Sequence, residues 1–164
     1  METRPEALVR DQSSRRSAWR PAGLIILCLT VGGLGSAATM PEIKGWYAGL
    51  AKPPFNPPNW IFGPVWSTLY VFMALAASNA WADRSARRIF FVILLVNALW
   101  SLLFFGLHQP GLALVDILAY LVLLVVWIRR LWPAHRGPAL LQLPHLAWVG
   151  FAAVLNAAIW WLNK

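Results

Sequence analysis

The side chains able to perform acid–base or metal chemistry are few in this chain and lie far apart. Asp116 is the one carboxylate inside a long apolar run, Cys28 is the single cysteine, and the histidines are His108, His135 and His145. One cysteine excludes an intramolecular disulfide, and no spacing of His, Cys or carboxylates predicts a metal site. The sequence also lacks nucleophile elbows, phosphate-binding glycine loops and paired catalytic carboxylates. Conventional hydrolase or kinase chemistry is therefore not expected.

Asp116 and His145 are the two polar residues that most need an explanation. A carboxylate inside an apolar run is costly unless it is neutralised, paired or hydrogen-bonded, and no Lys or Arg lies at that depth. We therefore expect Asp116 to hydrogen-bond to Tyr, Trp, Asn or backbone groups, with a role in proton-coupled export as the functional alternative. His145 stands at the start of an apolar run, where a solvated or capping role is usual and axial ligation of a haem iron is the alternative.

Aromatic residues recur at helical spacing together with an amide or a hydroxyl. Three such sets each share one side of a helix: Phe62, Trp66, Tyr70 and Met73; Asn97, Trp100, Ser101 and Phe104; and Trp148, Ala152, Asn156 and Trp160. Lipid offers an asparagine no hydrogen bond, so these faces are predicted to point into a helix bundle. They either pack helix against helix through an interhelical hydrogen bond or line a cavity.

The segment from Trp46 to Trp60 combines prolines with aromatic residues. Prolines fix the backbone φ angle and remove backbone donors, so a stiff, extended, non-helical loop is predicted. The prolines are Pro53, Pro54, Pro57 and Pro58, and the aromatic residues, expected on the underside of the loop, are Trp46, Tyr47, Phe55 and Trp60. Such a loop is either the lid of a ligand cavity or an aromatic belt at the membrane interface.

Five apolar segments must position these side chains. They cover Pro21–Met40, Ile61–Trp81, Ile89–Leu107, Gly111–Ile128 and Leu143–Leu162, each near the roughly 20 residues that cross a bilayer as a helix. Only 12% of the residues are charged and 59% are hydrophobic, whereas a soluble domain has about 25% charged residues. Because these segments lack the alternation of barrel strands, only helices can satisfy their backbone in hydrocarbon. The predicted fold class is all-α, a polytopic membrane protein with a five-transmembrane-helix bundle.

Basic residues are distributed asymmetrically around these segments. Eleven of the 14 lie in 1–20, 84–88 or 129–136, and the others are Lys44, Lys52 and Lys164. The positive-inside rule then predicts a basic cytoplasmic N-terminal tail (1–20), a membrane domain (21–164) in a bacterial cell membrane, and an external C-terminus and first loop. The tail is expected to be disordered and near anionic headgroups. Nucleic-acid binding is not expected, because the net charge of +8 does not gather on one face.

The first apolar segment has more than one interpretation. The pair Arg15 and Arg16 before it is compatible with a cleaved twin-arginine signal. If the segment is retained as a span, its small residues suit close helix packing or a local kink; they are Gly32, Gly33, Gly35 and Ser36.

From the first span onward, the chain resembles the TspO/MBR family, which includes the tryptophan-rich sensory proteins and the translocator or peripheral-type benzodiazepine receptors. The resemblance depends on a series of residues at family-like distances rather than on any one tryptophan. They are Trp46, Tyr47, Leu50, Lys52, Pro53, Pro57, Pro58 and Trp60 in the loop, then Phe62, Pro64, Trp66, Tyr70, Asn97, Trp100, Phe104, Asp116, Pro144, Trp148, Phe151, Ala152, Leu155 and Asn156.

This resemblance implies a homodimeric membrane protein with no obligatory cofactor that binds tetrapyrroles, such as protoporphyrin IX or haem, and other hydrophobic ligands beneath the first loop. The implied pocket walls are Trp46, Tyr47, Pro57, Trp66, Asn97, Trp100, Trp148, Ala152 and Asn156, with Lys52 able to meet a propionate. A sensory or translocator role without catalysis is expected. The alternatives are porphyrin degradation driven by light and oxygen, requiring Trp66 and Trp148, and proton-coupled export through Asp116.

Two features depart from the family pattern. A tyrosine often follows the proline at the head of the fifth span, and this chain has His145 there. The C-terminal cholesterol motif needs a tyrosine that the sequence VLNAAIWWLNK does not contain. Specific cholesterol recognition is therefore not predicted.

Overall fold

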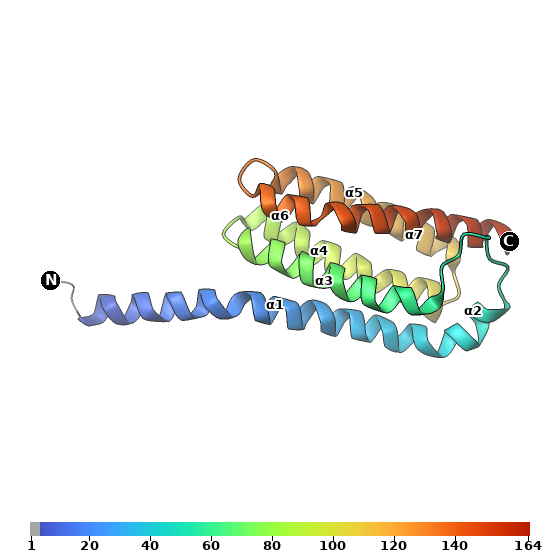
Figure 1. Cartoon of the computed structure of the whole chain (residues 1–164), viewed down its shortest axis with the longest axis horizontal. Helices are drawn as coiled ribbons and strands as arrows, with labels where there is room; N and C mark the ends of the chain where they lie inside the picture. The colour runs from blue at the N-terminus through green and yellow to red at the C-terminus, as the bar shows by residue number, and fades with distance from the viewer. Residues whose placement is uncertain (1–3) are drawn as a thin grey trace.

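The computed structural model describes the backbone of residues 4–164 and the side chains of residues 18–164. The described chain consists of helices joined by turns and loops, and it forms no strand (Figure 1). Its elements in order are α1 (Arg4–Lys44), α2 (Trp46–Gly49), the 3₁₀ turn η1 (Asn59–Ile61), α3 (Phe62–Asn79), α4 (Arg84–Ser101), the π-helical η2 (Leu102–Gly106), α5 (Pro110–Leu131), α6 (Arg136–Leu141) and α7 (Leu143–Leu162).

Five stretches of these helices are long and apolar enough to cross a membrane, which confirms the predicted fold class. They cover Ala18–Lys44, Asn59–Asn79, Arg84–Gly106, Pro110–Leu131 and Arg136–Leu162. The fifth stretch begins seven residues earlier than the sequence predicts, because the short helix α6 precedes α7 and extends the span.

The N-terminal tail differs from its expected disorder. Helix α1 continues back to Arg4, and Figure 1 shows it extending past the end of the bundle. Met1 to Thr3 lie outside the described residues, as do the side chains before Ala18, so the expected contact of the tail with headgroups falls outside the described part of the chain.

The helices form a closed bundle in which α1 packs on α3 and α4, and α5 packs on α4 and α7. The α3–α4 and α5–α6 turns lie at the end where α1 enters the bundle, and α2 lies at the other end near the C-terminus (Figure 1). The basic residues of segments 84–88 and 129–136 therefore meet at one end of the molecule. This separation of the two ends agrees with the asymmetry seen in the sequence.

One interaction at this basic end shows how the local sequence sets a helix boundary. Asp83 caps α4, because its Oδ1 accepts hydrogen bonds from the backbone N–H groups of Ser85 (2.9 Å) and Ala86 (3.1 Å). Its Oδ2 lies 2.8 Å from Arg130 Nε at the end of α5. The hydrogen bond from Arg130, followed by those from the backbone, holds the pKa of Asp83 below its usual value. Asp83 thus joins the start of α4 to the end of α5.

The interior of the bundle is mainly apolar with a few buried polar side chains, and the outer surface is apolar as lipid requires. Trp127, Tyr120 and Phe90 are among the largest fully buried side chains. Five polar side chains are also buried, namely Asn97, Asp116, Gln142, His145 and Asn156. Leu95 (69% exposed) and Val115 (66%) represent the many large apolar residues on the outside, where a water-soluble protein would place charge.

The small residues of α1 permit a close approach to its neighbours, as the sequence predicts. A Cβ at Gly32 would lie 2.3 Å from Tyr70 Cε2 on α3, and one at Gly35 would lie 3.0 Å from Ser101 Oγ on α4. A Cβ at Gly33 would meet nothing within 4 Å. Glycine is therefore required by packing at Gly32 and is merely tolerated at Gly33.

Candidate functional site

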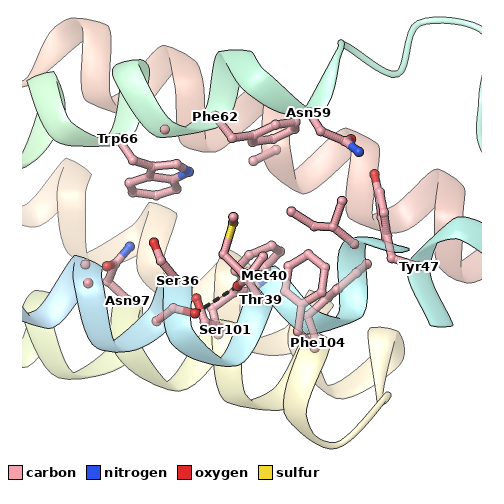
Figure 2. A pocket seen from close by; sticks show the side chains of 18 of the residues that line it. Ser36, Thr39, Met40, Tyr47, Asn59, Phe62, Trp66, Asn97, Ser101 and Phe104 are labelled. Carbon is pink, nitrogen blue, oxygen red and sulfur yellow. Dashed lines mark hydrogen bonds between the residues drawn. The ribbon is translucent and has the colours of Figure 1, made fainter. Parts of the chain in front are cut away.

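A cavity of about 350 Å³ lies inside the half of the bundle next to the first loop. Residues of α1, α3, α4, η2 and α7 surround it, and Tyr47 of α2 closes its outer end (Figure 2). Its aromatic lining residues are Tyr47, Phe62, Trp66, Tyr70, Trp100, Phe104 and Phe105. Its polar lining residues are Ser36, Thr39, Asn59, Ser67, Asn97, Ser101 and Asn156. No charged side chain belongs to the described lining, so the cavity offers flat apolar walls and neutral hydrogen-bonding groups.

Figure 2 shows how the walls face one another. Trp66 and Phe62 project from α3 on one side, and Ser36, Thr39 and Met40 project from α1 on the opposite side. Sequence reasoning did not include this face of α1 among the site residues. Its small residues were interpreted as a packing surface, and they prove to serve both purposes.

The structure brings six of the predicted wall residues together around the cavity and leaves four outside its lining. Tyr47, Trp66, Asn97, Trp100, Ala152 and Asn156 line it, whereas Trp46, Lys52, Pro57 and Trp148 do not. Of these four, Trp46, Lys52 and Trp148 each pack against a lining residue.

Trp46 attaches the first loop to the turn between η2 and α5. Its ring stacks on His108 with the centroids 4.3 Å apart, and it meets Phe104 edge-on at 5.7 Å. His108 Nε2 in turn lies 3.0 Å from Glu42 Oε2 near the end of α1. Because Phe104 lines the cavity, Trp46 supports the wall from behind.

The loop itself is only partly the extended segment predicted from its prolines. Trp46–Gly49 form one helical turn, whereas Pro53–Pro58 are irregular until η1 begins at Asn59. The prediction of a non-helical loop is therefore wrong at its start, because no proline interrupts those four residues. Trp60 also differs from expectation, since it is 74% exposed and does not lie beneath the loop.

Lys52 and Asn56 hold Tyr47 at the outer end of the cavity. The Tyr47 hydroxyl donates to Asn56 Oδ1 (3.0 Å), and Lys52 Nζ lies 4.6 Å from the centre of the Tyr47 ring. The same ammonium donates to the carbonyls of Ala48 and Leu50. Burial raises the pKa of Tyr47, and the hydrogen bond to Asn56 opposes that shift. Tyr47 thus separates Lys52 from the cavity. Pro57 belongs to the irregular part of the loop and does not line the cavity.

A second attachment of the loop comes from the C-terminus, where sequence reasoning expected nothing. Asn163 Oδ1 accepts from the Ala51 backbone N–H, and Asn163 Nδ2 donates to the Ala51 carbonyl, both at 2.9 Å. The side-chain amide of Asn163 thus satisfies both backbone groups of Ala51, as a neighbouring strand would, although the two residues are 112 positions apart in the sequence. Asn163 follows an apolar run, so its position alone carries no signal for the contact.

Two of the three asparagines that line the cavity, Asn97 and Asn156, have different roles. Asn97 Oδ1 accepts a hydrogen bond from the Tyr70 hydroxyl. Asn156 Oδ1 accepts from Trp100 Nε1 (3.0 Å), and Asn156 Nδ2 donates to the Pro110 carbonyl (2.8 Å). The protein therefore occupies both ends of the Asn156 amide. Asn156 thus orients the Trp100 ring, whereas Asn97 is bonded to Tyr70.

Trp148 lies behind the cavity wall. Its ring meets Phe62 edge-on, with the centroids 5.7 Å apart, and packs against Phe151 at 5.5 Å. Its Nε1 is buried and has no hydrogen-bond partner within the described part of the chain. Since Phe62 lines the cavity and Trp148 does not, Phe62 separates the Trp148 ring from the cavity.

Asp116 and His145 both correct the expectations from sequence. Asp116 is 9% exposed, and no described residue hydrogen-bonds to its Oδ2. The Tyr120 hydroxyl, one turn along α5, lies 2.7 Å from His145 Nε2. His145 is fully buried rather than solvated, and its Nδ1 lies 3.2 Å from Gln142 Oε1. Helix α6 moves the membrane boundary back to Arg136 and so places His145 inside the span. Asp116 and His145 do not line the cavity.

The chain matches the model of the TspO/MBR family over residues 24–162. It is 42% identical over 144 residues to the tryptophan-rich protein TspO of Archaeoglobus fulgidus, covering 85% of this chain and 94% of that protein. Identity to the TspO of Chlorobaculum tepidum is 35% over 144 residues, covering 84% and 91% of the two chains. Identity to the translocator protein of Bos taurus is 36% over 155 residues, covering 89% and 92%. With its five membrane-spanning helices, the chain is a multi-pass integral membrane protein that belongs to the TspO/MBR family.

Proposed function

We propose that this protein is a sensory or translocator membrane protein that binds a tetrapyrrole of the protoporphyrin IX or haem type in the cavity beneath its first loop. The observation that carries the proposal is the wall of the cavity, to which α2, α3, α4 and η2 contribute flat aromatic side chains and whose described lining contains no charged side chain. Relatives named tryptophan-rich protein TspO and translocator protein are consistent with this role.

The aromatic wall suits a flat conjugated ligand. Trp66 and Trp100 come from neighbouring helices, and Trp100 is held in its orientation by Asn156. A fixed ring loses little conformational freedom on binding, and each stacked or edge-on aromatic pair contributes about 0.5–1.5 kcal/mol beyond burial. Several such contacts would add a few kcal/mol to the free energy supplied by burial of the ligand.

The volume and charge of the cavity constrain how a tetrapyrrole would enter. About 350 Å³ is near the lower end of the range of roughly 300–1,000 Å³ for drug-sized ligands, so binding requires the first loop to move outward. The propionates have no cation in the described lining and would remain at the outer mouth. Lys52, adjacent to Tyr47, is the nearest cation that the loop supplies for a charge-assisted hydrogen bond.

Quenching of tryptophan fluorescence by protoporphyrin IX in the dark tests the proposal in detergent-purified protein. We expect saturable quenching in wild type and an affinity about tenfold lower in Trp66→Ala, since that ring lines the cavity. Trp161→Ala is the matched control, because Trp161 is 65% exposed on the outside. Quenching that does not saturate, or that weakens equally in both variants, would mean partitioning into the micelle and would overturn the proposal.

The orientation and the oligomeric state belong to the same proposal. The basic end of the bundle would face the cytoplasm of a bacterial cell and the first loop would face outward. An impermeant thiol reagent on intact cells should then label Pro54→Cys and leave Ser85→Cys unlabelled, while the native Cys28 is fully buried. Light scattering in detergent should give the mass of a homodimer. Labelling of the cysteine at position 85 but not of the one at position 54 would contradict the proposed orientation. A monomeric mass would contradict the proposed homodimer.

Degradation of the porphyrin in light is a second candidate, favoured by the Trp66 ring in the cavity wall. An indole against a photosensitiser can donate an electron or react with activated oxygen. Trp148 would act through Phe62 unless the site rearranges. Proton-coupled export has no such support, since Asp116 lies outside the lining.

A further inference from the structure

A second site-like arrangement lies at the basic end of the bundle, far from the cavity. Trp81, in the turn between α3 and α4, has two guanidinium groups over its ring. The Arg20 guanidinium carbon from α1 lies 5.7 Å from the ring centre, and that of Arg87 from α4 lies 5.2 Å from it. All three side chains are half-buried. Two cations held on one ring form a local concentration of positive charge.

The described side chains do not neutralise this charge. The nearest acidic residue in sequence is Asp83, whose carboxylate already binds Arg130 and caps α4. Arg87 donates one N–H to the Trp81 carbonyl (3.1 Å), which fixes its position and leaves its other donors available. Arginine offers a rigid fork of donors that matches the oxygens of a phosphate. The arrangement therefore fits an anion from outside the described chain.

The position of the three residues indicates which anion this is. Arg20 lies near the start of the first span (Ala18–Lys44) and Arg87 near the start of the third (Arg84–Gly106). Tryptophan at a span boundary is placed at the depth of lipid headgroups. From Arg87, helix α4 presents Phe91 (45% exposed) and Leu95 (69%) at intervals of four residues, and the Phe91 ring packs on Trp81 at 6.2 Å. A phosphate at the arginines would thus have an apolar track for its acyl chain below it.

We propose that Arg20, Trp81 and Arg87 form a binding site for the phosphate of an anionic phospholipid, with an acyl chain along Phe91 and Leu95. The lipid would link α1 to α4 at the basic end, where basic groups between membrane helices are suited to anionic headgroups. This site is independent of any ligand in the cavity.

Native mass spectrometry of the full-length protein, titrated in detergent with phosphatidylglycerol or phosphatidylcholine, tests the site. We expect tighter binding of the anionic lipid and an affinity about 30-fold lower in Arg20→Gln/Arg87→Gln, with about fivefold for each single change. The matched control is Arg84→Gln/Arg88→Gln, which removes the same charge from exposed positions with no cation–π contact of their own. Its affinity should fall less than threefold.

Three results would overturn the site. The first is an equal loss of lipid affinity in the control double variant, which would mean that the lipid is attracted by diffuse charge. The second is unchanged lipid affinity in the double variant of the site and in both single variants. The third is displacement of the lipid by millimolar inorganic phosphate, which would mean that the site binds a soluble anion. Far-UV circular dichroism and size-exclusion chromatography check that each variant is folded. If the double variant does not fold, the two single variants still test the site.

Discussion

Replacing Gly32 by alanine should destabilise the bundle, whereas the same replacement at Gly33 should not. The new Cβ at position 32 would lie 2.3 Å from Tyr70 Cε2, 2.9 Å from Cδ2 and 3.0 Å from Cζ, so the tyrosine ring must move. The ring is not free to do so, because its hydroxyl is bonded to Asn97 and its face packs on Trp66 with the centroids 5.8 Å apart. Position 33 faces open space.

The magnitude follows from two opposing effects. Overpacking a well-packed interior costs about 1–3 kcal/mol, and a weakened interhelical hydrogen bond in a membrane adds about 0.6 kcal/mol. Alanine in place of a helical glycine returns about 0.5–1 kcal/mol, which is the only effect at Gly33. We therefore expect Gly32→Ala to destabilise by about 1–3 kcal/mol and Gly33→Ala to be neutral or stabilising by up to about 1 kcal/mol.

Reversible unfolding in mixed micelles with increasing dodecyl sulfate, followed by circular dichroism, measures the difference. The cause is tested by repeating Gly32→Ala in a Tyr70→Ala background, where the clash is gone and the cost should disappear. Equal stability of the two alanine variants, or a cost at Gly32 that persists without the Tyr70 ring, would refute the steric reasoning. The affinity of Gly32→Ala for protoporphyrin should also be lower than that of Gly33→Ala, because the displaced Tyr70 ring would enter the cavity that it lines.

Three further predictions concern the polar contacts and the tryptophans. Asp83→Ala should destabilise by about 1 kcal/mol through loss of the α4 cap, whereas Asp83→Asn should retain most of the cap at pH 7. The pKa of Asp83 is lower in the folded protein than in the unfolded chain, so its contribution to stability is complete above the unfolded pKa of about 3.9 and is lost as the pH falls through the folded pKa. Thermal melts of Asp83→Asn should therefore lack this loss of stability in acid. Asn156→Leu should weaken protoporphyrin quenching severalfold by releasing Trp100, with unchanged affinity arguing against that orienting role. Under illumination with protoporphyrin, Trp66→Phe should slow product formation more than Trp148→Phe, since Trp66 alone of the two lines the cavity; equal rates in both variants and wild type would remove any special role for either ring.

Much of the fold follows from hydropathy, since the thickness of the bilayer sets the length of a span. The segment predicted as Ile61–Trp81 is observed as Asn59–Asn79, and that predicted as Ile89–Leu107 is observed as Arg84–Gly106. The inward faces also follow from sequence, because an asparagine in lipid would lose its hydrogen bonds. Asn97 and Asn156 accordingly both point inward.

The fifth span shows where such reasoning fails. The sequence places His145 at the membrane boundary because the apolar run begins at Leu143. In the fold, Gln142 is buried, and its Nε2 donates a hydrogen bond to the Phe72 carbonyl of α3. This bond holds the end of α6 against the bundle, so that His145, three residues later, is buried as well. That contact joins residues 70 apart, so no local pattern can reveal it.

Sequence by itself determined the five-helix membrane class, the basic and neutral ends, and which faces of the helices turn inward, because each depends on local spacing and on the cost of polar groups in lipid. Only the tertiary structure decided which inward residues surround a cavity. It placed Trp66 in the wall and Trp148 behind Phe62, brought the small residues of α1 to the opposite side, and tied Ala51 to Asn163. The physical reason is that a cavity is the space left where packing is incomplete, and this depends on the relative positions of helices that are distant in the chain.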